Sequence, residues 1–220
     1  MKPADYLRLK PYLQDVVLVQ GAVLQEPGER VVYVYFPQSG MISILAIMAN
    51  GDAIETAMVG SEGTLGAFAG VGPWRAVSRA VVQIPGRAVR ILATQFQTIF
   101  HAAEGIQRAV LQFKEALLSQ VQQTAACNAL HGAGQRLCRW LLHTHDRIDD
   151  DVIPLTQEFL SQMLGVTRTT VTEIARELQT AGLIRYSRGR IVVLDRGRLE
   201  EMACECYAAS KRYEAAGRRR

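Results

Sequence analysis

Residues 12–92 alternate short apolar runs with turn-forming residues. The clearest runs cover residues 33–36, 41–48, 77–82 and 87–92. Asn50-Gly51-Asp52 follows the second run and is a sequence typical of hairpin turns. Pro85-Gly86 separates the last two runs and predicts another turn. Short strands at this spacing with glycine-rich corners indicate a barrel or jelly roll. We therefore predict a β-roll sensor domain over residues 1–100.

The pattern changes near residue 93 to that of one long helix, from Glu104 to about Asn128. Its first apolar stripe, spaced at about 3.6 residues, consists of Ile106, Val110, Phe113, Leu117 and Val121. A second stripe, Leu111, Leu118 and Ala125, repeats every seven residues. One face can cover the barrel, and the economical partner for the other is the same helix of a second copy.

We therefore predict a dimerisation helix over residues 101–131 and assign the first stripe to it. The alternative is a single long helix buried in one core. The remaining segment, residues 132–220, is predicted to form a third part of the chain.

Within that part, residues 155–184 predict two short helices. Thr156 can cap the first helix, Gly165 allows a tight turn, and Thr167 can cap the second. The inward positions of the second helix are Val171, Ile174, Ala175 and Leu178. Two short helices joined by a glycine-containing turn form a helix-turn-helix.

The outward face of the second helix carries side chains of the kind that read DNA bases. We predict base contacts from Arg168, Thr169, Thr172 and Glu173, with the recognition helix 168–181 in the major groove. Residues 183–186 and 191–194 form a hairpin around Ser187-Arg188-Gly189-Arg190, which is typical of a basic wing. The predicted DNA backbone contacts are Thr156, Thr167, Arg176, Arg188 and Arg190.

Composition and charge agree with such a protein. Hydrophobic residues make up 49% of the 220 residues and charged residues 21%, which is a globular composition. No apolar run approaches the roughly 20 residues of a membrane span, and the N-terminus has no signal-peptide pattern, so we expect a cytoplasmic protein without membrane contact. The net charge is +4, and residues 156–198 carry seven arginines against four acidic residues. This mild basic bias suits phosphate contacts.

With these motifs, the chain resembles the Crp/Fnr family of bacterial transcription regulators over nearly all of its length. The resemblance implies an α+β fold: a cyclic-nucleotide-binding-like β-roll (jelly roll), a long dimerisation helix and a C-terminal winged helix-turn-helix. It places Arg168, Thr169 and Glu173 on the family's base-reading positions. Better-known members have Glu where Thr169 stands and often Arg where Glu173 stands. The family's usual operator sequence is therefore in question here, whereas an inverted repeat is still expected.

The family's sensor chemistry transfers poorly to this chain. Cyclic-nucleotide binders resemble Gly-Glu-Leu followed by Arg-Ser-Ala, but residues 63–68 read Gly-Thr-Leu-Gly-Ala-Phe, without that Glu. Glu62 and Arg75 could be a displaced pair in an effector pocket, although we favour a polar turn residue and a surface arginine. A cyclic nucleotide is therefore not expected.

Cysteine placement bears on metals and redox chemistry. The four cysteines are Cys127, Cys138, Cys204 and Cys206, so the N-terminal cysteine cluster that holds an iron–sulfur centre in oxygen-sensing members is missing. For Cys204 and Cys206 we favour a structural or surface role over a zinc site or a redox response. We predict no cofactor and no metal.

The leading hypothesis is a homodimeric DNA-binding regulator whose partners are double-stranded DNA, a second copy, RNA polymerase and an unidentified effector at the β-roll. The alternative is a ligand-binding regulatory protein whose winged helix docks a protein partner. An enzyme is disfavoured, because the sequence has no nucleophile–base pairing, no phosphate-cradling Gly-Lys motif and no His/Glu metal spacing.

Overall fold

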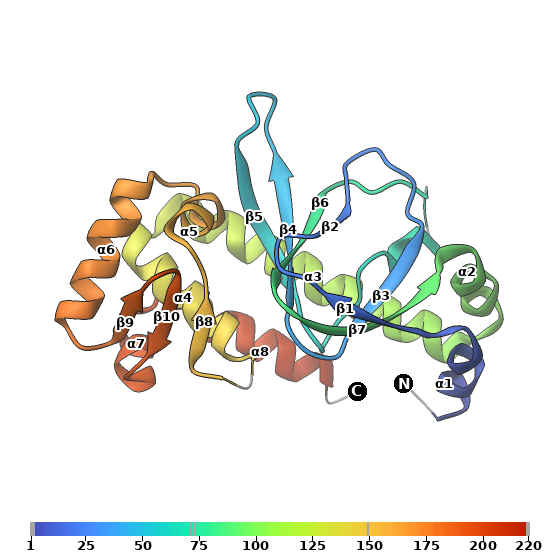
Figure 1. The fold of residues 1–220 in the computed structure, drawn as a ribbon. Helices are drawn as coiled ribbons and strands as arrows, with labels where there is room; N and C mark the ends of the chain where they lie inside the picture. Colours follow the sequence, from blue (N-terminus) through green and yellow to red (C-terminus); the bar gives the residue numbers. More distant parts are fainter. Residues whose placement is uncertain (1–2, 71, 73, 149, 219–220) are drawn as a thin grey trace. The chain divides into compact units, whose positions relative to one another are not determined.

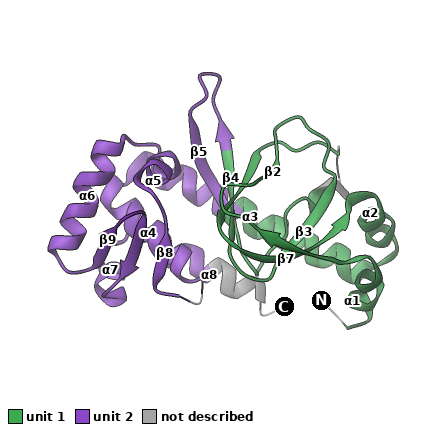
Figure 2. Ribbon diagram, in the orientation of Figure 1, with its two compact units in different colours: residues 1–45, 58–118 green, residues 46–57, 119–220 purple. Residues whose placement is uncertain are grey.

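A computed structural model describes residues 3–70, 72, 74–148 and 150–218. The chain divides into two compact units (Figure 2). Unit 1 contains residues 1–45 and 58–118, and unit 2 contains residues 46–57 and 119–220. The backbone therefore passes between the units three times, and residues 46–57 belong to the unit that holds the C-terminal half.

Unit 1 is built on antiparallel strands, which form two sheets (Figure 1). One sheet has the order β1-β7-β3 and the other β2-β6-β4-β5. The strands of the two sheets are β1 (Gln14–Leu18), β2 (Val23–Gln25), β3 (Tyr33–Pro37), β4 (Met41–Ile47), β5 (Ala53–Val59), β6 (Arg79–Ile84) and β7 (Gly86–Leu92). The end of β4 and most of β5 fall within residues 46–57 and so belong to unit 2. The helical segments are α1 (Pro3–Leu9), η1 (Lys10–Tyr12), η2 (Ala67–Gly70) and α2 (Ala93–Ala102). The predicted N-terminal β-roll and the turn between β4 and β5 are confirmed. At Pro85 the chain instead passes from β6 of one sheet directly into β7 of the other.

The core of unit 1 has two apolar clusters. One lies against the sheets and includes Ile42 and Val82, which pair across β4 and β6 and are completely buried. The other gathers Phe96 and Phe100 of α2 with residues of β3 and β7. Helix α3 (Glu104–Leu130) contributes to both clusters from its first half.

The assignment of the first stripe of this helix needs a correction. Ile106 and Val110 are buried in the α2 cluster, and Phe113 and Leu117 pack against the sheet cluster. These side chains are taken up by the same chain, because the β-roll offers the nearest apolar surface to cover them. The exposed apolar stripe of α3 is the second one, with Leu111 46% and Leu118 55% exposed. Val121, the last residue of the first stripe, is half-buried.

Unit 2 is built around α4 (Ala133–His145), of which residues 136–144 are all buried. Its other elements are β8 (Val152–Pro154), α5 (Gln157–Leu164), α6 (Arg168–Thr180), β9 (Ile184–Ser187), β10 (Arg190–Val193), α7 (Arg196–Met202) and α8 (Cys206–Arg218). The three short strands form an antiparallel sheet of order β8-β10-β9. Among the described residues, no helix has the length and apolar character that crossing a bilayer requires.

Residues 46–57 join unit 2 through two contacts. Trp140 of α4 donates its indole N–H to Glu55 Oε1 at 2.8 Å, and both side chains are buried. Ile54 lies against the turn at Gly165, where its Cδ1 is 2.8 Å from the position that a Cβ would take. Strand β5 thus contacts α4 and the turn between α5 and α6.

Replacing Gly40 tests how tightly the backbone is packed at the corner before β4. Its φ is +78°, and an added Cβ would lie 2.6 Å from the Ile84 carbonyl oxygen and 2.8 Å from that of Pro85. We expect Gly40→Ala to lower the free energy of unfolding by about 2 kcal/mol or more, from left-handed strain of about 1–2 kcal/mol plus the backbone clash. Urea unfolding followed by circular dichroism measures the loss.

The matched control is Gly51→Ala. Gly51 also has a positive φ, +91°, but its Cβ position has no atom within 4 Å. This variant should show the conformational strain alone, about 1 kcal/mol. Equal losses in the two variants would contradict the clash at Gly40.

Candidate nucleic-acid interface

Helices α5 and α6 begin at threonine caps. The Thr156 hydroxyl accepts a hydrogen bond from the Phe159 N–H at 3.2 Å, and the Thr167 hydroxyl accepts one from the Thr170 N–H at 3.2 Å. Each cap satisfies an N–H group that the helix itself cannot pair. The start of the second helix is therefore fixed at Arg168, as the sequence predicted.

Glycines end both helices. Gly165 has φ of +61°, and the Val166 N–H reaches back to the Ser161 carbonyl at 3.1 Å. Gly182 has φ of +73°, and the Leu183 N–H reaches back to the Leu178 carbonyl at 3.0 Å. This is the Schellman pattern, which needs a left-handed residue after the helix. It leaves only residues 165–167 to turn the chain from α5 into α6.

The inner face of α6 is buried as predicted. Val171, Ile174, Ala175 and Leu178 are all in the core of unit 2. The outer face presents Arg168, Thr169, Glu173 and Arg176, which are all exposed. Arg168 Nη1 is 3.1 Å from Glu158 Oε2, but both side chains are more than 60% exposed. An exposed pair of this kind contributes only about 0–1 kcal/mol, so Arg168 remains available to a stronger partner.

Three of the four threonines among the predicted contacts use their hydroxyl groups in hydrogen bonds within the chain. Thr172 Oγ1 lies 3.1 Å from Gln157 Oε1 and 2.9 Å from the Arg168 carbonyl, and its side chain is only half-exposed. Thr156 and Thr167 use their hydroxyls as helix caps. Of the predicted base-contact residues, Arg168, Thr169 and Glu173 therefore have the most accessible side chains.

The wing is a two-residue hairpin between β9 and β10. Ser187 pairs with Arg190, and the two residues between them, Arg188 and Gly189, have φ of 47° and 73°. Positive φ at both central positions is the type I′ turn, whose twist matches that of the strands. Arg188 and Arg190 are exposed. The turn thus presents two guanidinium groups at the tip of the sheet.

Buried polar contacts hold this unit on α4. Arg136 donates to the Leu164 carbonyl at 3.0 Å, at the end of α5, and to Asn128 Oδ1 at 3.1 Å. Arg196 of α7 donates to Asp146 at 2.8 Å, and Lys211 pairs with the same carboxylate at 3.0 Å. Burial raises the pKa of Asp146, but hydrogen bonds from Lys211 and Arg196 outweigh it and hold the pKa below its usual value.

The two candidate effector residues are engaged in separate turns of unit 1. Glu62 Oε1 accepts from the Gly60 N–H at 3.2 Å. Arg75 is exposed and donates to the Gly28 carbonyl at 2.6 Å. Each side chain thus bonds to a backbone group of a nearby loop.

The structure brings together a second group of side chains that the sequence analysis did not combine into one cluster. Cys127, His131, Cys204 and Cys206 come together in unit 2, with their ligand atoms within 4.8 Å of one another. The available signals were the four-residue spacing of Cys127 and His131 at a helix end and the Cys-Glu-Cys at 204–206. Neither signal shows that the two pairs meet, because 72 residues lie between His131 and Cys204 in the sequence.

The thiols of this cluster differ in acidity. The hydrogen bond between the Cys127 and Cys204 sulfurs raises the pKa of Cys127 and lowers the pKa of Cys204 to about 6. Burial raises the pKa of Cys206. Cys138 lies elsewhere on α4, and burial raises its pKa to about 11. Three of the four cysteines therefore lie in the cluster, and Cys138 lies outside it.

The comparisons with known proteins agree with this geometry. Residues 135–202, from the first turns of α4 to the end of α7, match the family model of the Crp-like helix-turn-helix domain. No curated protein matches the sequence. The structures of many proteins do resemble it, and three of them are described next.

FixK2 from Bradyrhizobium japonicum has a TM-score of 0.74 at 17% identity, over 87% of this chain and 98% of that one. A putative regulator of the Crp/Fnr family from Eubacterium rectale has a TM-score of 0.72 at 17% identity, over 92% and 94%. The c-di-GMP responsive global regulator CLP from Xanthomonas campestris has a TM-score of 0.70 at 16% identity, over 88% and 100%. At these identities the likeness concerns the fold. The chain has the DNA-binding fold of Crp/Fnr-type transcription regulators, and its residues 135–202 form a Crp-like helix-turn-helix domain.

Proposed function

We propose that this protein regulates transcription by binding an inverted-repeat operator as a homodimer, with α6 in the major groove. The observation that carries the proposal is the exposed start of α6, where Arg168, Thr169 and Glu173 share a face on a helix fixed by its cap. In helix-turn-helix proteins this end of the recognition helix contacts base edges. The expected partners are double-stranded DNA, a second copy of the chain and RNA polymerase.

The exposed side chains support base reading by their chemistry. An arginine can donate two hydrogen bonds to N7 and O6 of guanine, and a glutamate can accept one from the cytosine amino group. A well-formed bidentate contact discriminates by about 1–3 kcal/mol, more than the exposed Glu158 pair contributes to Arg168. DNA can therefore draw Arg168 away from Glu158.

The wing supports phosphate contacts beside the recognition helix. Arg188 and Arg190 are exposed at a rigid turn, and neither has an acidic partner among the ion pairs found in the described residues. Guanidinium groups placed in this way fix a protein on the duplex without reading its sequence. Their contribution should depend on salt.

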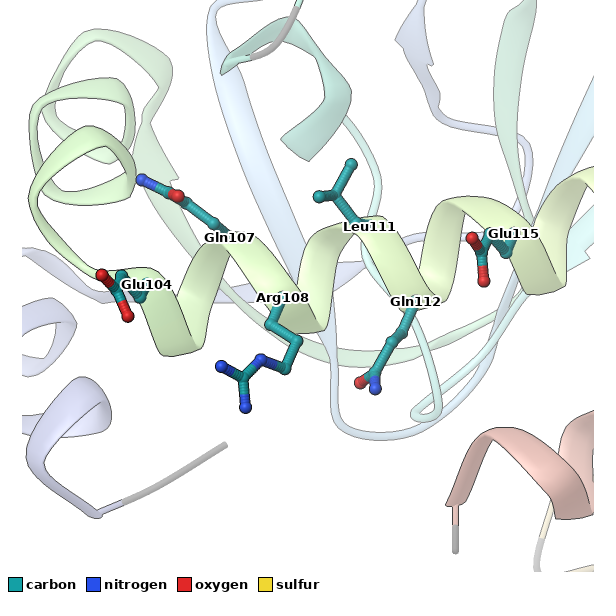
Figure 3. A pocket seen from close by; sticks show the side chains of 6 residues that line it. All are labelled: Glu104, Gln107, Arg108, Leu111, Gln112 and Glu115. Atoms are coloured by element: carbon teal, nitrogen blue, oxygen red, sulfur yellow. The ribbon is translucent and has the colours of Figure 1, made fainter. Parts of the chain in front are cut away.

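The exposed stripe of α3 supports self-association. A shallow groove runs along this helix beside Leu111, lined by charged and amide side chains (Figure 3). Its lining residues are Glu104, Gln107, Arg108, Leu111, Gln112 and Glu115. Leucines repeating every seven residues with charged neighbours are typical of a two-helix seam. A second copy of α3 is the partner that this repeat fits, because it carries the same spacing.

A dimer is also the reason for expecting an inverted-repeat operator. Two recognition helices related by a twofold axis contact half-sites about 34 Å, or one DNA turn, apart. A signal at the β-roll would then act by shifting the pair of α3 helices between two arrangements, which couples the two ends of the chain.

Selection of bound sites from random DNA tests the proposal. We expect an inverted repeat with half-site centres about 10–11 base pairs apart. Arg168→Ala should weaken binding to this site by about 1–3 kcal/mol, or five- to 150-fold, and relax the preference at one base pair of each half-site. Arg87→Ala, at an exposed arginine of β7 in unit 1, should change neither. A winged helix that docks a protein would instead give no enriched motif under any salt condition.

Salt dependence tests the wing separately. Replacing both Arg188 and Arg190 with Gln should weaken binding to all sequences equally, because phosphate contacts carry no base information. The slope of log affinity against log salt should fall in magnitude by about two, one for each lost contact. The control Arg87→Gln should leave the slope unchanged. A changed motif with an unchanged slope would place these arginines on bases instead.

Leu118→Glu tests the dimer. A charge on the exposed stripe should convert the dimer to a monomer in analytical ultracentrifugation, because burying an unpaired carboxylate in an apolar seam is costly. Leu130→Glu serves as the control, since Leu130 is 78% exposed on the same helix but outside the seven-residue repeat. A Leu118→Glu protein that remains dimeric would place the interface elsewhere.

A further inference from the structure

Two segments that are distant in sequence meet at the end of α3. Cys127 lies in the last turn of this helix, and the His131 N–H still bonds to the Cys127 carbonyl at 3.0 Å. The two residues therefore project from the same helical turn. Cys204 lies in the link between α7 and α8, and Cys206 is the first residue of α8. The three cysteines are buried together as one cluster.

We propose that Cys127, His131, Cys204 and Cys206 bind one Zn²⁺ ion as a closed four-ligand site. Three thiolates and one imidazole form one of the usual ligand sets of structural zinc. On binding, the three thiols release their protons to solvent and their sulfurs coordinate the metal, so the metal and its ligands together carry one negative charge.

The distances fit a tetrahedral ion. With Zn–S near 2.3 Å and Zn–N near 2.0–2.1 Å, tetrahedral ligands lie about 3.8 Å apart for two sulfurs and about 3.6 Å for sulfur and nitrogen. The Cys127 and Cys204 sulfurs are 3.4 Å apart, and Cys206 Sγ is 3.5 Å from His131 Nδ1. All four ligand atoms lie within 4.8 Å of one another, so side-chain movements of up to about 1 Å would complete the coordination.

The surrounding side chains orient the ligands as in known zinc sites. His131 Nε2 lies 3.2 Å from Glu205 Oε1, which leaves Nδ1 directed toward Cys206. A carboxylate that holds the far nitrogen of a ligating histidine is the usual support of such a ligand. Gln123 Nε2 donates to Cys206 Sγ at 3.0 Å, a hydrogen bond that favours the thiolate.

The site would have a structural role. All four positions of the ion are filled by the protein, so none is open for a substrate or a water. The metal would join the end of α3 to the start of α8, and both segments belong to unit 2. The proposal does not rest on DNA binding, because its readout is the metal itself.

Metal analysis of the full-length protein tests the site. Protein produced with zinc and purified under reducing conditions should contain about one zinc per chain by mass spectrometry. Cys204→Ser and Cys206→Ser should each reduce zinc to near zero. The matched control is Cys138→Ser, a buried cysteine of α4 outside the cluster, which should keep about one zinc. His131→Cys should retain the metal, whereas His131→Ala should bind it at least tenfold more weakly.

A measurement on the unmodified chain keeps the test independent of variant folding. Stripped of metal under reducing conditions and titrated with Co²⁺, the protein should develop the d–d bands of tetrahedral cobalt and a thiolate charge-transfer band at one equivalent. Absence of these bands, or zinc retained in Cys204→Ser, would overturn the proposal. The proposal would also be overturned if a Cys127–Cys204 disulfide formed in air even when excess zinc had been added beforehand.

Discussion

The burial of α4 is the constraint on which the C-terminal unit depends. Nine consecutive residues of this helix, 136–144, are buried, although an amphipathic helix needs cover on one side only. Two of its buried side chains have acceptors: Arg136 donates to the Leu164 carbonyl at the end of α5, and Trp140 donates to Glu55. Both nitrogens of His143 are buried without a hydrogen-bond partner among the described residues. The Arg136 bond ties the last turn of α5 to α4, just before the Gly165 turn into α6.

Helices α5 and α6 could be predicted from the sequence because their determinants are local. Thr156, Gly165 and Thr167 act within four residues of their own positions, through caps and a left-handed turn. The inner and outer faces of α6 then follow from helical periodicity. Strands β3, β4, β6 and β7 were predictable because each is an apolar run bounded by turn residues, whereas β1, β2 and β5 were not identified individually.

What could not be predicted depends on which surfaces meet. The periodicity of α3 identified two apolar stripes correctly, but periodicity does not say which partner covers which stripe. The stripe of Ile106 and Val110 is covered by α2 and the β-roll of the same chain, so the stripe of Leu111 and Leu118 is the exposed one. The cysteine–histidine cluster is still harder to predict from the sequence, because α4 to α7 lie between its two halves along the chain.

The β4–β5 hairpin has a consequence for dissecting the molecule. Its strands belong to the sheet of the N-terminal half, while Ile54 and Glu55 pack on the helix-turn-helix unit. A fragment that starts at residue 132 would therefore lack the acceptor of a buried indole N–H and the side chain beside Gly165. A chimeric protein that joins this C-terminal half to the N-terminal half of another protein would contain that protein's hairpin in place of β4–β5. Compatibility between residues 46–57 and α4 would decide whether such hybrids fold.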